Sequence, residues 1–119
     1  MEPSFTELYP DIVAAGSLAA ALERTAAELG LDLGEVQFAD PMVLLEWASI
    51  PHVLAAGRPL WVRTTPFERV FGIDGRAPGG EPLRGNTPDL SEVVRAAAAW
   101  RGGASLREVR QAATFVNGA

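Results

Sequence analysis

The amino-acid sequence predicts an α+β domain, in which an antiparallel sheet of four to five strands is covered on one face by an N-terminal helix and a C-terminal helix pair. Three observations support this class. Short β-rich segments cluster in the middle of the chain, helical patterns flank them, and a turn signal, Thr65-Pro66, separates two of them. With 119 residues the chain is expected to be a single domain, 1–119, large enough to bury a core.

The N-terminal part of the chain is expected to be helical. Residues 1–16 are an extension packed on the body, with short helices around 6–8 and after Pro10, because the proline interrupts a continuous helix. Ser17 is the expected N-cap of the first long helix, and Gly30 is its expected stop. The apolar stripe of that helix comprises Leu18, Leu22, Ala26 and Leu29.

The β-rich middle begins with a short strand at 36–38 and a turn at Asp40-Pro41. A longer strand is expected over 42–49. Its apolar residues would occupy both faces, which is typical of a central strand. Residues 50–58 form a loop, and loops of this length often bind ligands.

A β-hairpin follows, with arms at 60–64 and 67–73 and Pro66 in the turn. Since side chains alternate across a strand, Leu60, Val62 and Thr64 share one face of the first arm, and Trp61, Arg63 and Thr65 share the other. In the second arm Phe67, Arg69, Phe71 and Ile73 are expected on one covered face. Residues 81–84 can add a fifth strand.

The C-terminal part shows two helix starts. Thr87 is the expected N-cap of a helix over 88–101, with Pro88 at its first position. Ser105 and Glu108 form a capping box for a last short helix, and residues 115–116 can return to the body. The residues predicted to be core are Leu22, Leu45, Trp47, Val62, Phe71, Val94 and Trp100.

Composition excludes several classes of function. The net charge of −5 and pI near 4.8 argue against nucleic-acid binding, and the sequence contains no basic cluster. No apolar run approaches the roughly 20 residues that span a bilayer, no secretory signal is evident, and cysteine is absent. A cytoplasmic protein is therefore expected. All ten basic residues are arginine and alanine is abundant, which is typical of a high-GC bacterial genome.

The chain resembles a family of small bacterial proteins, described as natural product biosynthesis proteins, that contain a domain of unknown function. The resemblance runs from Leu8 onward and rests on Leu8-Tyr9-Pro10, Gly16-Ser17-Leu18, Glu68-Arg69, Phe71, Gly85, Thr87, Asp89-Leu90, Trp100, Ser105-Leu106-Arg107-Glu108 and Phe115. The resemblance implies that the gene lies near genes for biosynthetic enzymes of secondary metabolism. It supplies no catalytic residue.

The sequence gives little support for a nucleophilic catalytic site or for a metal site. The only histidine, His52, lies in the 50–58 loop, and no Gly-x-Ser-x-Gly nucleophile signal accompanies it. A single histidine among scattered carboxylates does not have metal-ligand spacing, so no metal and no cofactor are expected. The glycines at 72, 75, 79 and 80 precede no helix and are read as turn residues, not as a phosphate cradle.

The remaining candidates are charged or aromatic residues of the sheet and its loop. A buried charge needs a partner, so Arg69 is expected to pair with Glu46. The pair is either structural or part of a ligand site. In the second case Glu46, His52, Trp61, Arg63 and Arg69 line a pocket between the sheet and loop 50–58. Trp61 can be a core anchor or a platform for an aromatic or peptide ligand.

Two classes of function follow. The first is an accessory protein of a natural-product pathway that binds a small-molecule intermediate or a peptide without a cofactor. The second is a non-catalytic protein–protein interaction module. An enclosed pocket with convergent polar groups would favour the first, and an exposed apolar patch or sheet edge the second. The sequence leaves open whether the protein is catalytic and whether it is a homodimer.

Overall fold

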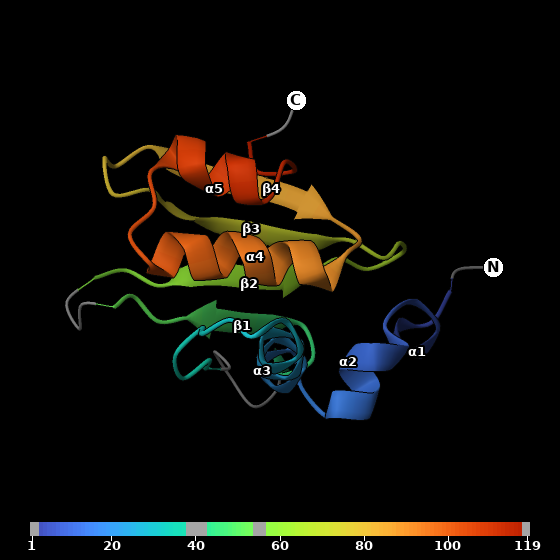
Figure 1. Ribbon diagram of the computed structural model, residues 1–119. Helices are drawn as coiled ribbons and strands as arrows, with labels where there is room; N and C mark the ends of the chain where they lie inside the picture. The colour runs from blue at the N-terminus through green and yellow to red at the C-terminus, as the bar shows by residue number, and fades with distance from the viewer. Residues whose placement is uncertain (1–2, 38–42, 54–56, 118–119) are drawn as a thin grey trace.

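The computed structural model describes residues 3–37, 43–53 and 57–117 and shows an α+β fold with one antiparallel sheet (Figure 1). The strands are β1 (Trp47–Ile50), β2 (Leu60–Thr64), β3 (Phe71–Arg76) and β4 (Pro82–Thr87). They lie in the order β1-β2-β3-β4, so every strand pairs with its neighbour in the chain. The helices are α1 (Phe5–Leu8), α2 (Pro10–Ala15), α3 (Leu18–Leu29), α4 (Leu90–Arg101) and α5 (Leu106–Ala112). The predicted fold class is confirmed, with four strands.

The two faces of the sheet differ in what covers them. In Figure 1, α4 and α5 lie in front of the sheet and α3 is seen almost end-on beside β1. α3 contacts β1, and α4 contacts both β3 and β4. The buried face is lined by Ala48, Ile50, Leu60, Val62, Phe71, Ile73 and Leu83. No helix of the described chain covers the opposite face, where β2 exposes Trp61 and Arg63.

Local capping chemistry determines both ends of α3. The Ser17 hydroxyl accepts a hydrogen bond from the Ala20 N–H at 3.0 Å, as an N-cap does. Gly30 ends the helix with φ of 70°, a left-handed conformation that glycine adopts without a Cβ clash. Both predicted ends are confirmed.

α4 begins two residues later than the sequence predicts. Thr87 is the last residue of β4, and Asp89 is the N-cap, accepting from the Ser91 N–H at 2.9 Å. The Thr87 hydroxyl instead accepts from the Asp89 N–H at 3.2 Å and so holds the strand-to-helix corner. The capping box of α5 is confirmed. The Ser105 N–H donates to the Glu108 carboxylate, which lowers the pKa of Glu108.

The predicted central strand at 42–49 is wrong in position and in length. Residues 43–46 form a turn, and β1 is a short strand at the edge of the sheet. The Glu46 N–H donates to the Val43 carbonyl at 2.9 Å and closes the turn. The Leu44 carbonyl accepts the Leu18 N–H at 2.9 Å, which ties the segment to the first residue of α3. Of the strand predicted at 36–38, only a bridge between Gln37 and Ser49 is observed. Phe38, the turn at Asp40-Pro41 and Met42 lie outside the described residues.

The second arm of the hairpin also differs from the prediction, because β3 begins at Phe71 and residues 65–70 form a loop. Phe67 has φ of 71° and is 64% exposed, so the alternation expected from Phe67 to Ile73 is interrupted. The Thr65 N–H donates to the Val70 carbonyl at 3.0 Å, which closes the loop. Phe71 and Ile73 face the core as expected, whereas Phe67 and Arg69 leave the sheet.

Both edges of the sheet are partly covered by the chain itself. The edge of β4 meets residues 115–117: Val116 bridges Gly85, and the Arg84 N–H donates to the Asn117 side chain at 2.8 Å. A Cβ on Gly85 would lie 2.7 Å from the Phe115 ring, so a glycine is needed for this close approach. At the edge of β1, Gln37 and Ser49 exchange two backbone hydrogen bonds. Few strand groups therefore remain available for pairing with another chain.

Candidate functional site

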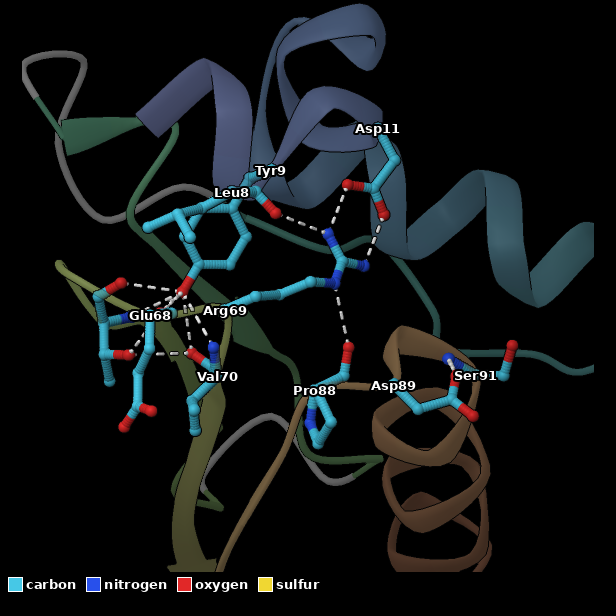
Figure 2. Close-up of polar contacts among 10 residues, drawn as sticks. Leu8, Tyr9, Asp11, Glu68, Arg69, Val70, Pro88, Asp89 and Ser91 are labelled. Carbon is cyan, nitrogen blue, oxygen red and sulfur yellow. Dashed lines mark hydrogen bonds and ion pairs between the residues drawn. The ribbon is translucent and has the colours of Figure 1, made fainter. Parts of the chain in front are cut away.

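Arg69 does not pair with Glu46, in contrast to the prediction. Its guanidinium binds both carboxylate oxygens of Asp11, at 2.8 and 2.9 Å, as Figure 2 shows. Glu46 is exposed and lies in the turn before β1. The difference arises because the 65–70 loop carries Arg69 off the sheet face, towards the start of α2.

The same guanidinium joins three parts of the chain. It donates to the carbonyl of Leu8 at 3.1 Å and to that of Pro88 at 3.0 Å, and it lies 5.0 Å from the centre of the Phe71 ring. The hydrogen bonds from Arg69 lower the pKa of Asp11, and the same contacts raise the pKa of Arg69. We refer to Leu8, Tyr9, Asp11, Arg69 and Pro88 as the N-terminal clamp.

Tyr9 is the buried centre of the clamp and was not singled out as functional by sequence reasoning. Its side chain is fully buried, and its hydroxyl accepts hydrogen bonds from the backbone N–H groups of Thr65 and Val70, at 3.1 and 3.0 Å (Figure 2). The nearest carbonyl that its single proton can reach is that of Thr65, at 2.7 Å. The signal in the sequence was a lone tyrosine in an apolar stretch, because a buried hydroxyl must find a partner. These contacts indicate that the clamp has a structural role.

A second group of residues lies on the uncovered side of the sheet, which we call the open face. The strand register forms two rows across it. Trp47 lies opposite Arg63, which lies opposite Gly72. In the next row Trp61 lies opposite Asp74. By the alternation of side chains along the strands, the open face consists of Trp47, Ser49, Trp61, Arg63, Gly72, Asp74, Arg76, Pro82, Arg84 and Asn86.

Trp47 was predicted to be a core residue, and this is wrong. Ala48 and Ile50 of β1 point into the core, so the alternation places Trp47 on the open face. The two rings of Trp47 and Trp61 meet edge to face, with centroids 6.2 Å apart, and each residue is 38% exposed. The prediction left Trp61 open, and the structure places it outside the core.

A shallow depression of about 240 Å³ lies beside the two indoles, and we call it the tryptophan hollow. It is lined by Trp47, Trp61, Arg63, Gly72, Ile73 and Asp74. Gly72 makes room for it, since a Cβ there would lie 3.1 Å from the Arg63 guanidinium carbon. Among the described residues Arg63 forms no ion pair, so its charge faces the hollow without a carboxylate partner.

His52 lies apart from the tryptophan hollow. Its ring is 5.5 Å from that of Trp100 and nearly perpendicular to it, in a separate depression of about 340 Å³ that Arg58, Arg76 and Arg101 also line. Of the five site residues expected from the sequence, the structure brings together Trp61 and Arg63. It places Glu46, His52 and Arg69 elsewhere.

Within residues 3–37, 43–53 and 57–117, no group of three or more acidic or histidine side chains is arranged to hold a metal ion. No helix of the described chain has the length and hydropathy needed to cross a bilayer. No protein-family model matches the chain, and comparisons with curated proteins and with solved structures give no significant match.

Proposed function

We propose that this chain is a cofactor-free binding protein whose open face captures a peptide segment of a partner, in an accessory role within a natural-product pathway. The observation that carries the proposal is the pair of exposed tryptophans beside Arg63, which forms no ion pair with the described residues, on a sheet face that no described helix covers. Tryptophan and arginine are the residue types that contribute most to binding energy at protein interfaces.

A purely structural explanation accounts for only part of this arrangement. An edge-to-face pair such as Trp47 and Trp61 stabilises a sheet by about 0.5–1.5 kcal/mol. That effect does not require Arg63 to lie across Gly72 with no carboxylate partner among the described residues. A ligand that buries the indoles and supplies an acceptor would satisfy all three side chains.

The size of the tryptophan hollow favours a peptide over a small-molecule intermediate. Its volume of about 240 Å³ is below the roughly 300–1,000 Å³ typical of small-ligand pockets, and it suits one apolar side chain of a longer partner. Strand addition is a less suitable mode, since Gln37 and residues 115–117 occupy parts of both sheet edges. The face of the sheet is then the surface on which we place the partner.

The proposal can be tested with peptides selected from a random displayed library against the folded protein. In ¹H–¹⁵N spectra, bound peptides should move the indole signals of Trp47 and Trp61. The signal of Trp100 is an internal control, because that side chain is buried and its N–H donates to the Arg76 carbonyl. Selected peptides that bind but leave the first two indoles unmoved would refute the open face as the site.

A glycine substitution adds a second test that removes no chemical group. Gly72→Ala places a methyl group in the hollow, against flexible ends of Arg63 and Asn86, at a position without positive φ. The protein should fold normally and bind the selected peptides several-fold more weakly. Gly102→Ala is the matched control, since its methyl group would lie near backbone of α4 at ordinary contact distance.

A further inference from the structure

A second depression adjoins the tryptophan hollow, and we call it the arginine hollow. It has a volume of about 230 Å³ and is lined by Arg58, Pro59, Trp61, Asp74, Gly75, Arg76 and Arg84. Trp61 and Asp74 belong to both hollows and form a shared wall between them. One extended segment crossing that wall would contact both.

The guanidinium groups of the arginine hollow are only weakly engaged by the protein. Arg84 approaches Asp74 at 3.3 Å, with both side chains more than 60% exposed. Arg76 donates to the Gly80 carbonyl at 3.3 Å. Arg58 makes no hydrogen bond or ion pair with any part of the chain that the structure describes. Each group therefore has donors left for a ligand.

The local charge is opposite to that of the whole protein. Three arginines and one aspartate line the arginine hollow, Arg63 adds a further positive charge next to it, and the chain as a whole has a net charge of −5. A generally basic surface does not explain such a cluster. It provides charge complementarity to an acidic partner, which sets specificity and speeds association.

We infer that the partner segment is an acidic peptide, which places an apolar side chain in the tryptophan hollow and carboxylates against Arg58, Arg76 and Arg84. This inference rests on the proposed function and specifies the class of ligand. Arginine forks bind carboxylates through paired, charge-assisted hydrogen bonds. Asp74 competes with the ligand for Arg84, so it limits the affinity. An oligonucleotide is a worse match, because it extends beyond the small region that the arginines line. The chain as a whole has a net charge of −5, so the rest of it repels a long polyanion.

The test uses two capped synthetic peptides, Gly-Glu-Glu-Phe-Glu-Glu-Gly and its isosteric Gln counterpart, titrated while the indole signals of Trp47 and Trp61 are followed. The Glu peptide should bind more tightly, and the difference should shrink as ionic strength rises. Arg58→Gln and Arg84→Gln should each lower the affinity for the Glu peptide by roughly two- to fivefold and leave the affinity for the Gln peptide unchanged. Arg107→Gln is the matched control, an equal change of charge on α5.

Asp74→Asn supplies a test by gain of binding, which a folding defect cannot imitate. Removing the Asp74 carboxylate should raise the affinity for the Glu peptide by roughly two- to fivefold and should not change the affinity for the Gln peptide. Equal binding of the two peptides, with both indoles moving, would overturn the acidic specificity and leave the proposed function standing. Failure of both peptides and of all selected peptides to move either indole would overturn both. Tighter binding of an oligothymidine than of the Glu peptide would assign the arginines to a different polyanion and also overturn the inference.

Discussion

Replacing Arg69 by alanine tests the assignment of the N-terminal clamp. The substitution removes four hydrogen bonds, two to the Asp11 carboxylate and two to the backbone carbonyls of Leu8 and Pro88. The Asp11 side chain is 43% exposed and can be hydrated after the change, so the 3–5 kcal/mol penalty of a stranded buried charge does not apply. The ion pair then contributes about 1 kcal/mol. The contacts to the two carbonyls, partly buried at Leu8 and exposed at Pro88, add about 1–2 kcal/mol together, giving a loss of about 2–3 kcal/mol in the free energy of unfolding.

Denaturant unfolding of Arg69→Ala and of Glu46→Gln measures this directly. The second variant is a control at the residue first expected to be the partner. Because Glu46 is exposed and away from the clamp, its change should stay within about 0.5 kcal/mol. If Arg69→Ala cost no more than Glu46→Gln, or if the two substitutions were strongly non-additive, the clamp geometry would be refuted.

The pH dependence of the same quantity separates the ion pair from the carbonyl contacts. Arg69 lowers the pKa of Asp11 in the folded protein, so this carboxylate stabilises the fold above its ordinary pKa of 3.8 and less so as pH falls through the lowered value. The difference in unfolding free energy between the wild type and Asp11→Asn should therefore be constant from about pH 5 to 8 and vanish in more acidic solution. A difference that persisted unchanged in acid would contradict the pairing.

Three further predictions follow from burial and charge. Tyr9→Phe should lower the unfolding free energy by about 1–3 kcal/mol, because the partly buried Val70 N–H loses its acceptor, whereas the Thr65 N–H keeps the Val70 carbonyl; a denaturant midpoint within error of wild type would contradict this. Phe71→Ala should cost about 3–5 kcal/mol, whereas Leu45→Ala should cost clearly less, about 1–2 kcal/mol, since Phe71 is fully buried and Leu45 only partly; equal costs would show that the packing is misassigned. Duplex DNA and RNA should show no salt-dependent mobility shift at low micromolar protein, given the net charge of −5.

The elements that the sequence predicts well are those whose chemistry is local. Ser17, Gly30 and the Ser105–Glu108 capping box each form hydrogen bonds with groups only a few residues away. The structure confirms all three predicted positions. The start of α4 was misplaced because Thr87 and Asp89 are both good N-caps. The choice between them depends on how far β4 extends, which is a property of the sheet.

The elements that the sequence predicts poorly depend on partners distant in the chain. The prediction extended the strand without interruption from Phe67 to Ile73. The left-handed backbone at Phe67 breaks the alternation of side chains, so Arg69 no longer lies on the same face as Phe71. Asp11, the partner of Arg69, is 58 residues away in the sequence. The candidate site was found only in part, through Trp61 and Arg63. Trp47 and Gly72 joined them because of cross-strand register, which composition does not specify.

The order of the strands has a consequence for how the molecule assembles. Each sheet pairing joins consecutive strands, so the β1-β2-β3-β4 meander can close through short loops at little entropic cost. The N-terminal part of the clamp, in contrast, must bring Tyr9 to a loop 56–61 residues away before any hydrogen bond of the Tyr9 hydroxyl forms. The N-terminal segment should then dock onto a sheet that already exists and be the first part to detach on unfolding. Its interactions would slow the unfolding rate of the native state and leave the folding rate nearly unchanged.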